Sequence, residues 1–147
     1  MKSIFLIGRL IFGGFFLYNG IHHLQQRKAM AQYASSKGVP RPELAVVGSG
    51  ALLLAGGASV LLGIKPRWGT LAIITFLSGV SPVMHDFWKS DDPARKQSDM
   101  INFMKNMAML GAAMAFMGME EPWPVSVPIG QPNRFERVKK YVRQVAA

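Results

Sequence analysis

Polar and titratable side chains lie at the ends of apolar runs in this sequence, and two of these ends carry histidines. Asn19, His22 and His23 are spaced i, i+3 and i+4, so they share one face if the segment is helical. His85 and Asp86 follow the apolar run TLAIITFLSGVSPVM. A histidine can donate, accept or relay a proton, and a neighbouring aspartate can orient it. These residue types indicate hydrogen-bonding or proton-transfer chemistry.

A third polar face has the same spacing near the start of the last apolar run. If four helices alternate in direction, the ends of the first and third meet the starts of the second and fourth at one membrane boundary. We therefore predict one polar cluster, a candidate ligand site with no assigned catalytic residue. Its members are Asn19, His22, His23, His85, Asp86, Asn102, Lys105 and Asn106. The alternative is that these groups only fasten helix ends at the lipid headgroups.

The elements that would position this cluster are four apolar runs. Half of the 147 residues are hydrophobic and only 17% are charged, which leaves little polar surface for soluble helices. The runs cover residues 3–24, 44–64, about 69–87 and about 100–119. Each has the roughly 20 residues that cross a hydrocarbon core of about 30 Å. We predict an all-α fold, an integral membrane four-helix bundle, and we interpret the first run as a retained span rather than a signal peptide because Arg9 interrupts it.

The chain divides into two predicted regions, the bundle at residues 1–119 and an appendage at residues 120–147. The appendage begins with EEPWPVSVPIGQP, whose prolines preclude a long helix and predict an extended strap. Residues 133–147 combine apolar and basic residues at a spacing that fits a short amphipathic helix on a membrane surface or a partner, and the alternative is a solvated basic tail. We expect Asp99 to be the N-cap of the fourth helix. We expect Arg9 to form a structural ion pair with Glu120 or Glu121.

Composition excludes several classes of protein. The chain has no cysteine, so disulfides and thiolate metal sites are absent, and we predict no metal site. The methionines of the fourth run are typical of packing rather than of Cu(I) binding. The net charge of +9 is concentrated in the links and the tail, which favours anionic lipid over nucleic acid as partner. The distribution of basic residues weakly favours both termini in the cytoplasm.

Several segments together resemble the DoxX family of small bacterial membrane proteins. These are GRLIFGGFFLYNGIHHL, GVPRPELAVVGSGALLLAGG, LLGIKPRWGTLAIITFL, MHDFW and NFMKNMAMLGAAM, in order from Gly8 to Met119. The resemblance implies a four-helix bundle in the bacterial inner membrane. The family is named after the small subunit of a thiosulfate:quinone oxidoreductase, and other members are associated with oxidative-stress complexes. Ser49-Gly50-Ala51 stands in the second helix where many members carry a glutamate.

Two functional hypotheses follow. The first, which we favour, is an auxiliary subunit of a redox or energy-converting membrane complex, packing against larger subunits. The second is a quinone-binding oxidoreductase subunit in which the histidines or Lys105 donate hydrogen bonds to a quinone. A free-standing enzyme is less favoured, because the chain has no motif for a flavin, a dinucleotide, an iron–sulfur cluster or covalent haem.

The expected contacts follow from these hypotheses. The expected partners are membrane lipid and other integral membrane subunits, with self-association possible and no nucleic acid. The sequence assigns no cofactor, and the candidates are quinone, haem or a pigment contacted only through a partner complex. Axial haem ligation by two histidines and small-molecule transport are the remaining alternatives.

Overall fold

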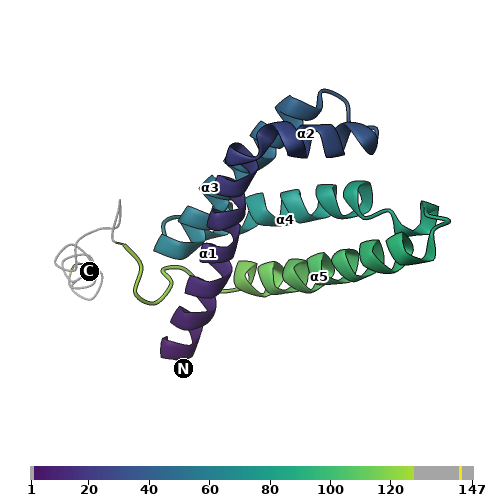
Figure 1. Cartoon of the computed structure of the whole chain (residues 1–147). Coiled ribbons are helices and arrows are strands. Elements are labelled where there is room, and N and C mark those ends of the chain that lie inside the picture. Colours follow the sequence, from purple (N-terminus) through teal and green to yellow (C-terminus); the bar gives the residue numbers. More distant parts are fainter. Residues whose placement is uncertain (1, 128–142, 144–147) are drawn as a thin grey trace.

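The computed structural model describes residues 2–127 and 143, and almost all of this part is helical (Figure 1). The elements are α1 (Lys2–Gln25), α2 (Arg27–Ser36), α3 (Pro42–Leu62), α4 (Pro66–Met84), the 3₁₀ helix η1 (Phe87–Lys89) and α5 (Pro93–Met117). No strand occurs among the described residues. The predicted all-α fold is thus confirmed. The amphipathic helix predicted over residues 133–147 lies outside the described residues, apart from Arg143.

Three segments are long and apolar enough to cross a membrane: Lys2–Gln25, Pro42–Leu62 and Pro66–Lys89. They match the first three predicted spans. The fourth predicted span forms most of α5, but this helix begins at Pro93 with the polar turns PARKQSD. Helix α5 is not among the strongly apolar helices of the described residues.

Prolines set the starts of three helices. Pro42, Pro66 and Pro93 each lie in the first turn, where a missing N–H costs nothing and the fixed φ already suits a helix. The N-cap of α5 is Asp92, whose carboxylate accepts hydrogen bonds from the backbone nitrogens of Ala94 and Arg95 at 3.3 and 3.2 Å.

The prediction that Asp99 is the N-cap of the fourth helix was therefore wrong. Asp99 is a buried residue inside α5. The Asp-Pro pair at positions 92 and 93 is the stronger start signal, because it supplies both a capping carboxylate and a first-turn proline.

Helix α2 was not predicted, because its sequence, RKAMAQYASS, falls in a segment interpreted as a polar link. It buries Ala31 and Ala34 in a small cluster with Val46 of α3, and Met84 of α4 packs against this cluster. The helix therefore folds back onto the start of α3 and the end of α4 rather than standing free in solvent.

Glycines bring α1 and α3 into backbone contact. A Cβ atom added at Gly13 would lie 2.7 Å from the backbone nitrogen of Leu61, and one added at Gly20 would lie 2.7 Å from that of Leu54. Neither distance is tolerable, so only glycine permits this approach. Glycines therefore allow α1 and α3 to pack at backbone distance.

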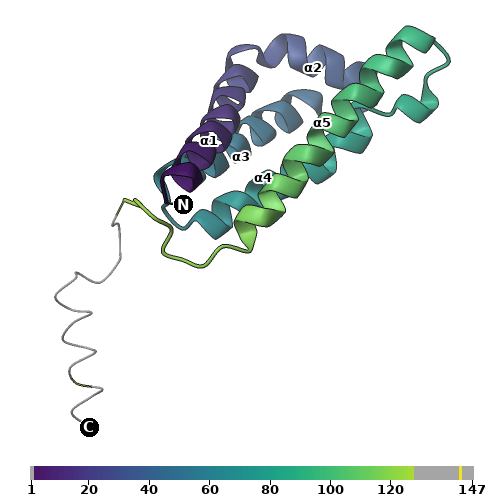
Figure 2. The same ribbon diagram turned by 90° about the horizontal axis from the view of Figure 1, so that it is seen from below.

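The helices meet at one end of the molecule and separate toward the other (Figures 1 and 2). The N-terminus, the α3–α4 turn and the end of α5 lie together at what we call the closed end. Helix α2 and the α4–α5 link lie at the opposite, open end. Edge-to-face aromatic contacts fill the closed end, where Phe5 lies 5.7 Å from Phe116 and 5.5 Å from Trp123 between ring centroids.

Residues 120–127 form a non-helical strap across the closed end, as predicted for the start of the appendage. Trp123 is only 2% exposed and belongs to the main hydrophobic core. The backbone nitrogen of Val127 donates to the carbonyl of Leu62 over 3.0 Å. The strap is thus part of the bundle's packing.

Arg9 has different partners from those predicted. It is buried, and its guanidinium donates to the carbonyl oxygens of Pro124 and Val125, both at 2.8 Å. Glu121 instead accepts a hydrogen bond from the backbone nitrogen of Arg67 at 3.0 Å. The expected ion pair does not occur among the described residues, because the strap turns its carbonyls, not its glutamates, toward Arg9.

Candidate functional site

A cavity of about 630 Å³ lies between the helices near the open end. Its walls come from α1, α2, α3, α4 and α5, because the α1–α3 pair and the α4–α5 pair separate there (Figure 1). Most of the wall is apolar. The apolar side chains include Phe15, Phe16, Met30, Val46, Leu52, Phe76, Leu77, Val80, Val83, Met84 and Met109.

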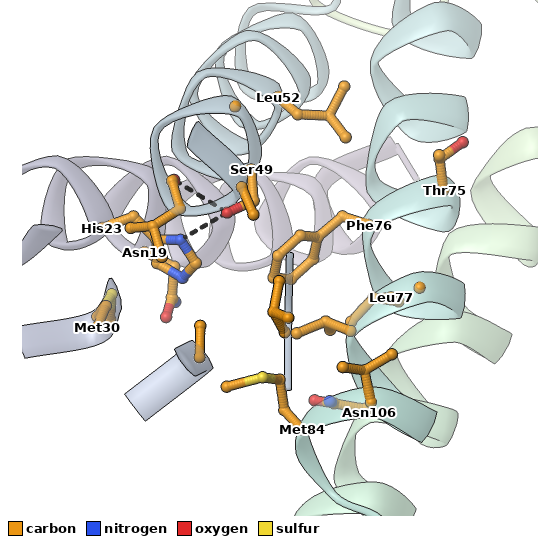
Figure 3. Close-up of a pocket in the computed structure, with 18 of the residues that line it drawn as sticks. Asn19, His23, Met30, Ser49, Leu52, Thr75, Phe76, Leu77, Met84 and Asn106 are labelled. Carbon is orange, nitrogen blue, oxygen red and sulfur yellow. Dashed lines mark hydrogen bonds between the residues drawn. The ribbon is translucent and has the colours of Figure 1, made fainter. Parts of the chain in front are cut away.

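Only a few polar groups interrupt this lining. In Figure 3, Asn19 and His23 extend from α1, Ser49 from α3 and Asn106 from α5 around the same space. His85, immediately after α4, also lines the cavity. Four of the eight predicted cluster residues are therefore brought to one cavity.

His23 is held by Ser49. Its Nδ1 lies 3.1 Å from Ser49 Oγ, and the Ser49 hydroxyl donates to the carbonyl of Val46 at 3.0 Å (Figure 3). The imidazole ring also packs edge-on against Phe76, with ring centroids 5.8 Å apart. These contacts fix the ring's orientation on the cavity wall.

His85 is held by Asp99, a residue that we had expected to be a helix cap. His85 Nδ1 lies 3.3 Å from Asp99 Oδ1. Asp99 in turn lies 3.4 Å from Lys37 Nζ and 3.9 Å from Arg95 Nε. His85 therefore connects the apolar cavity to a group of charged side chains at the open end.

The charged cluster consists of Lys37, Asp86, Asp99 and His85. Lys37 Nζ lies 2.6 Å from Asp86 Oδ1, and the Lys37 side chain is only 5% exposed. These ion pairs tie the α2–α3 link to both the end of α4 and the first turns of α5. A second, polar cavity of about 360 Å³ opens beside them.

The Lys37 ammonium is held in its charged form. Burial by itself lowers the pKa of Lys37, but the hydrogen bonds and negative charges of Asp86 and Asp99 outweigh this effect and raise the pKa above its usual value. Lys37 thus carries a positive charge at neutral pH, and the pairs with the two carboxylates persist there.

The single polar cluster predicted from the sequence divides into several parts. Asp86 belongs to the charged cluster and does not line the apolar cavity. His22 stacks on Tyr18 with ring centroids 6.2 Å apart, and it lies outside both cavity linings. Asn102 and Lys105 also lie outside them.

Sequence reasoning missed Lys37, Ser49 and Asp99 as members of the site. A signal existed for Asp99 and Lys37: each is a charged residue beside an apolar element, and such a residue needs a partner if it is buried. Ser49 lies three residues after Val46 on α3, a spacing that allows a serine hydroxyl to return to the helix backbone. None of these signals identifies the partner.

The cavity has an apolar body and a small number of fixed polar groups, which suits a molecule with a polar ring and an apolar remainder. Exposed residues from two spanning helices, including Gly48 of α3 and Gly79 and Val83 of α4, form part of its wall. At both glycines a Cβ atom would meet nothing within 4 Å. The wall is therefore open between α3 and α4, at the level of the spanning helices.

Comparison with known proteins gives one match. The family model described as DoxX matches residues 4–86, which is more than half of the 147 residues and covers α1 through α4. The NFMKN segment of α5 lies outside the matched range. No curated protein and no solved structure matches the chain.

Proposed function

The chain belongs to the DoxX family, and from this premise we propose that it binds a quinone-type molecule in the cavity between its helix pairs, as a subunit of a membrane redox complex. The observation that carries the proposal is the apolar cavity whose few polar groups lie near the open end. Its volume of about 630 Å³ is within the roughly 300–1,000 Å³ of small-molecule sites.

The polar residues of the cavity have complementary tasks in this proposal. His23 and His85 hydrogen-bond to the oxygens of the bound ring, while Asn19 and Asn106 offer further amide contacts. The aromatic and aliphatic wall, including Phe16, accommodates the apolar part of the ligand. Ser49 and Asp99 orient the two histidines.

The route of entry follows from the opening between α3 and α4. Both helices have the length and hydropathy of membrane spans, so their exposed faces contact lipid. A ligand dissolved in the bilayer reaches the cavity past Gly48 and Gly79 without crossing water. This route suits a molecule with a long apolar chain.

Narrowing the opening tests the proposal. Gly79→Leu adds a side chain where the wall is open, whereas Gly111→Leu adds the same side chain on α5, outside the cavity lining. We expect Gly79→Leu to weaken binding of decyl-benzoquinone or decyl-hydroquinone at least tenfold, and Gly111→Leu to leave it unchanged. Calorimetric titration of the detergent-purified protein measures both. Equal affinities in the two variants and the wild type would contradict entry and binding at this site.

The role as an auxiliary subunit in the bacterial inner membrane, with both termini in the cytoplasm, remains part of the proposal. Gly13 and Gly20 pack inside the chain, and Trp123 of the strap is buried in the core, so none of the three is available to a partner. Partner subunits would therefore contact other faces. Stoichiometric co-purification with a cofactor-bearing membrane protein would support the subunit role, and recovery of the chain alone would contradict it.

A further inference from the structure

We infer that the cavity selects the reduced, hydroxyl-bearing form of a quinone-type ligand, a hydroquinone, over the carbonyl-bearing quinone. The inference rests on the proposed function, because it assumes that the cavity binds such a ring. It comes from the hydrogen bonds that fix which ring nitrogen of His23 and of His85 carries the proton. The sequence alone had suggested the opposite role, that of histidines donating to quinone carbonyls.

The hydrogen of the Ser49 hydroxyl determines the tautomer of His23. A serine hydroxyl has a single hydrogen to donate. Ser49 donates it to the carbonyl of Val46, at 3.0 Å. With its hydrogen on that carbonyl, the Ser49 oxygen accepts from His23 Nδ1, 3.1 Å away, and this nitrogen then carries the proton. The neutral ring of His23 then has a bare lone pair on Nε2.

Asp99 determines the tautomer of His85 in the same way. An ionised carboxylate only accepts hydrogen bonds, so His85 Nδ1, 3.3 Å from Asp99 Oδ1, must be the donor. Lys37 and Arg95 lie on the other side of this carboxylate and neutralise its charge. The neutral ring of His85 also has its lone pair on Nε2.

Both histidines that line the cavity therefore have their acceptor at Nε2 when they are neutral. The Asn19 amide donates one of its two hydrogens to the carbonyl of Phe15 at 2.7 Å, which leaves one amide hydrogen on this residue beside the two imidazole acceptors. A hydroquinone brings two O–H donors, which satisfy two imidazole acceptors. A quinone brings only carbonyl acceptors, and it leaves the imidazole lone pairs buried without a donor, which is costly in an apolar cavity.

The experiment compares three probes on the purified full-length protein in detergent under anaerobic conditions. These are decyl-hydroquinone, decyl-benzoquinone and the di-O-methyl ether of the hydroquinone, which keeps the ring but has no O–H. We expect the hydroquinone to bind about tenfold more tightly than the other two, which corresponds to about 1.4 kcal/mol. The readout is the ratio of dissociation constants, measured by calorimetric titration.

Two adjacent histidines supply the matched variants. His23→Gln places an amide with both a donor and an acceptor on the cavity wall, so the ratio should fall toward one. His22→Gln changes the neighbouring residue, which stacks on Tyr18 outside the cavity, and should keep the ratio of the wild type. Each ratio compares two ligands on one protein. A general loss of stability therefore affects both dissociation constants alike and leaves their ratio unchanged.

The outcomes separate the two proposals. Equal affinities, or tighter binding of the quinone, would overturn the selection of the hydroquinone while leaving the cavity as a ligand site. Binding of none of the three probes would overturn both the selection and the proposed function. A wild-type preference that survives His23→Gln unchanged would overturn the role assigned to this histidine.

Discussion

The closed and open ends of the molecule each bury a cation, but they satisfy it differently. At the closed end, Arg9 donates to two backbone carbonyls of the strap, and Phe5, Phe116 and Trp123 pack against one another. At the open end, Lys37 pairs with two carboxylates, and the space beside them is a cavity. Packing stabilises the closed end, and ion pairs stabilise the open end.

This difference separates stability from ligand binding. Dense packing leaves no room for a ligand, and its contribution to stability is large and independent of ionic conditions. Ion pairs can join the α2–α3 link to the α4–α5 link beside a cavity, because each pair needs one close contact and not a packed surface. The open end thus keeps α2 and the α4–α5 link in place without filling the space between the helix pairs.

The largest expected effect is at the closed end. Trp123→Ala removes a core side chain that is 2% exposed, and we expect it to lower the free energy of unfolding by about 3–5 kcal/mol. The control is Trp68→Ala on α4, where the side chain is 71% exposed. Its effect should be below about 1 kcal/mol. Unfolding in detergent with increasing SDS measures both, and similar losses would refute the view that packing holds this end.

A smaller loss is expected at the open end. Lys37→Met leaves Asp86 and Asp99 facing each other without their buried cation, and we expect a cost of roughly 1–3 kcal/mol. Lys89→Met removes another cation near Asp86, at 3.6 Å, but this side chain is 71% exposed. Its removal should cost less than about 1 kcal/mol. The same SDS titrations compare them, and equal costs would show that burial of Lys37 does not matter.

The contribution of Lys37 has a defined dependence on pH. Because its pKa is raised in the folded protein, the stabilisation is fully present below the usual lysine value of 10.5 and is lost as pH rises through the folded-state pKa. The difference in unfolding free energy between wild type and Lys37→Met should therefore be constant from pH 7 to about 9.5. A decline within that range would contradict the raised pKa.

The smallest effect concerns a local contact of the open end. Asp92→Ala removes the N-cap of α5 and should cost about 1 kcal/mol. Asp91→Ala changes the adjacent exposed carboxylate, which caps nothing in the described structure, and should be nearly neutral. Thermal unfolding in detergent resolves the pair. A larger cost than that of Lys37→Met would mean that helix initiation, not the ion pairs, holds this end.

Hydropathy and connectivity predicted much of this architecture. Apolar runs of about 20 residues locate spanning helices because lipid tolerates few alternatives. Alternation of direction then correctly brought His23, His85 and Asn106 to one end. These inferences depend only on local composition and on the number of helices, and both can be read from the sequence.

The cavity itself was not accessible from the sequence. It exists because glycines such as Gly13 allow α1 to pack closely against α3, while the α4–α5 pair diverges from these two helices. A hydropathy pattern does not specify the angles at which helices cross. The pairing of Lys37 with Asp99 spans 62 positions of the sequence and depends on α2, whose few buried alanines give only a weak helical signal.

The strap has a consequence for biosynthesis. Pro124 and Val125, which supply the carbonyls that Arg9 needs, are made after all the long helices of the described residues. A nascent chain that ends at Met117 therefore contains α1 with an arginine whose partners have not yet been synthesised. We expect such intermediates to be recognisable by membrane proteases and chaperones, so that release of the finished bundle awaits the residues that follow α5.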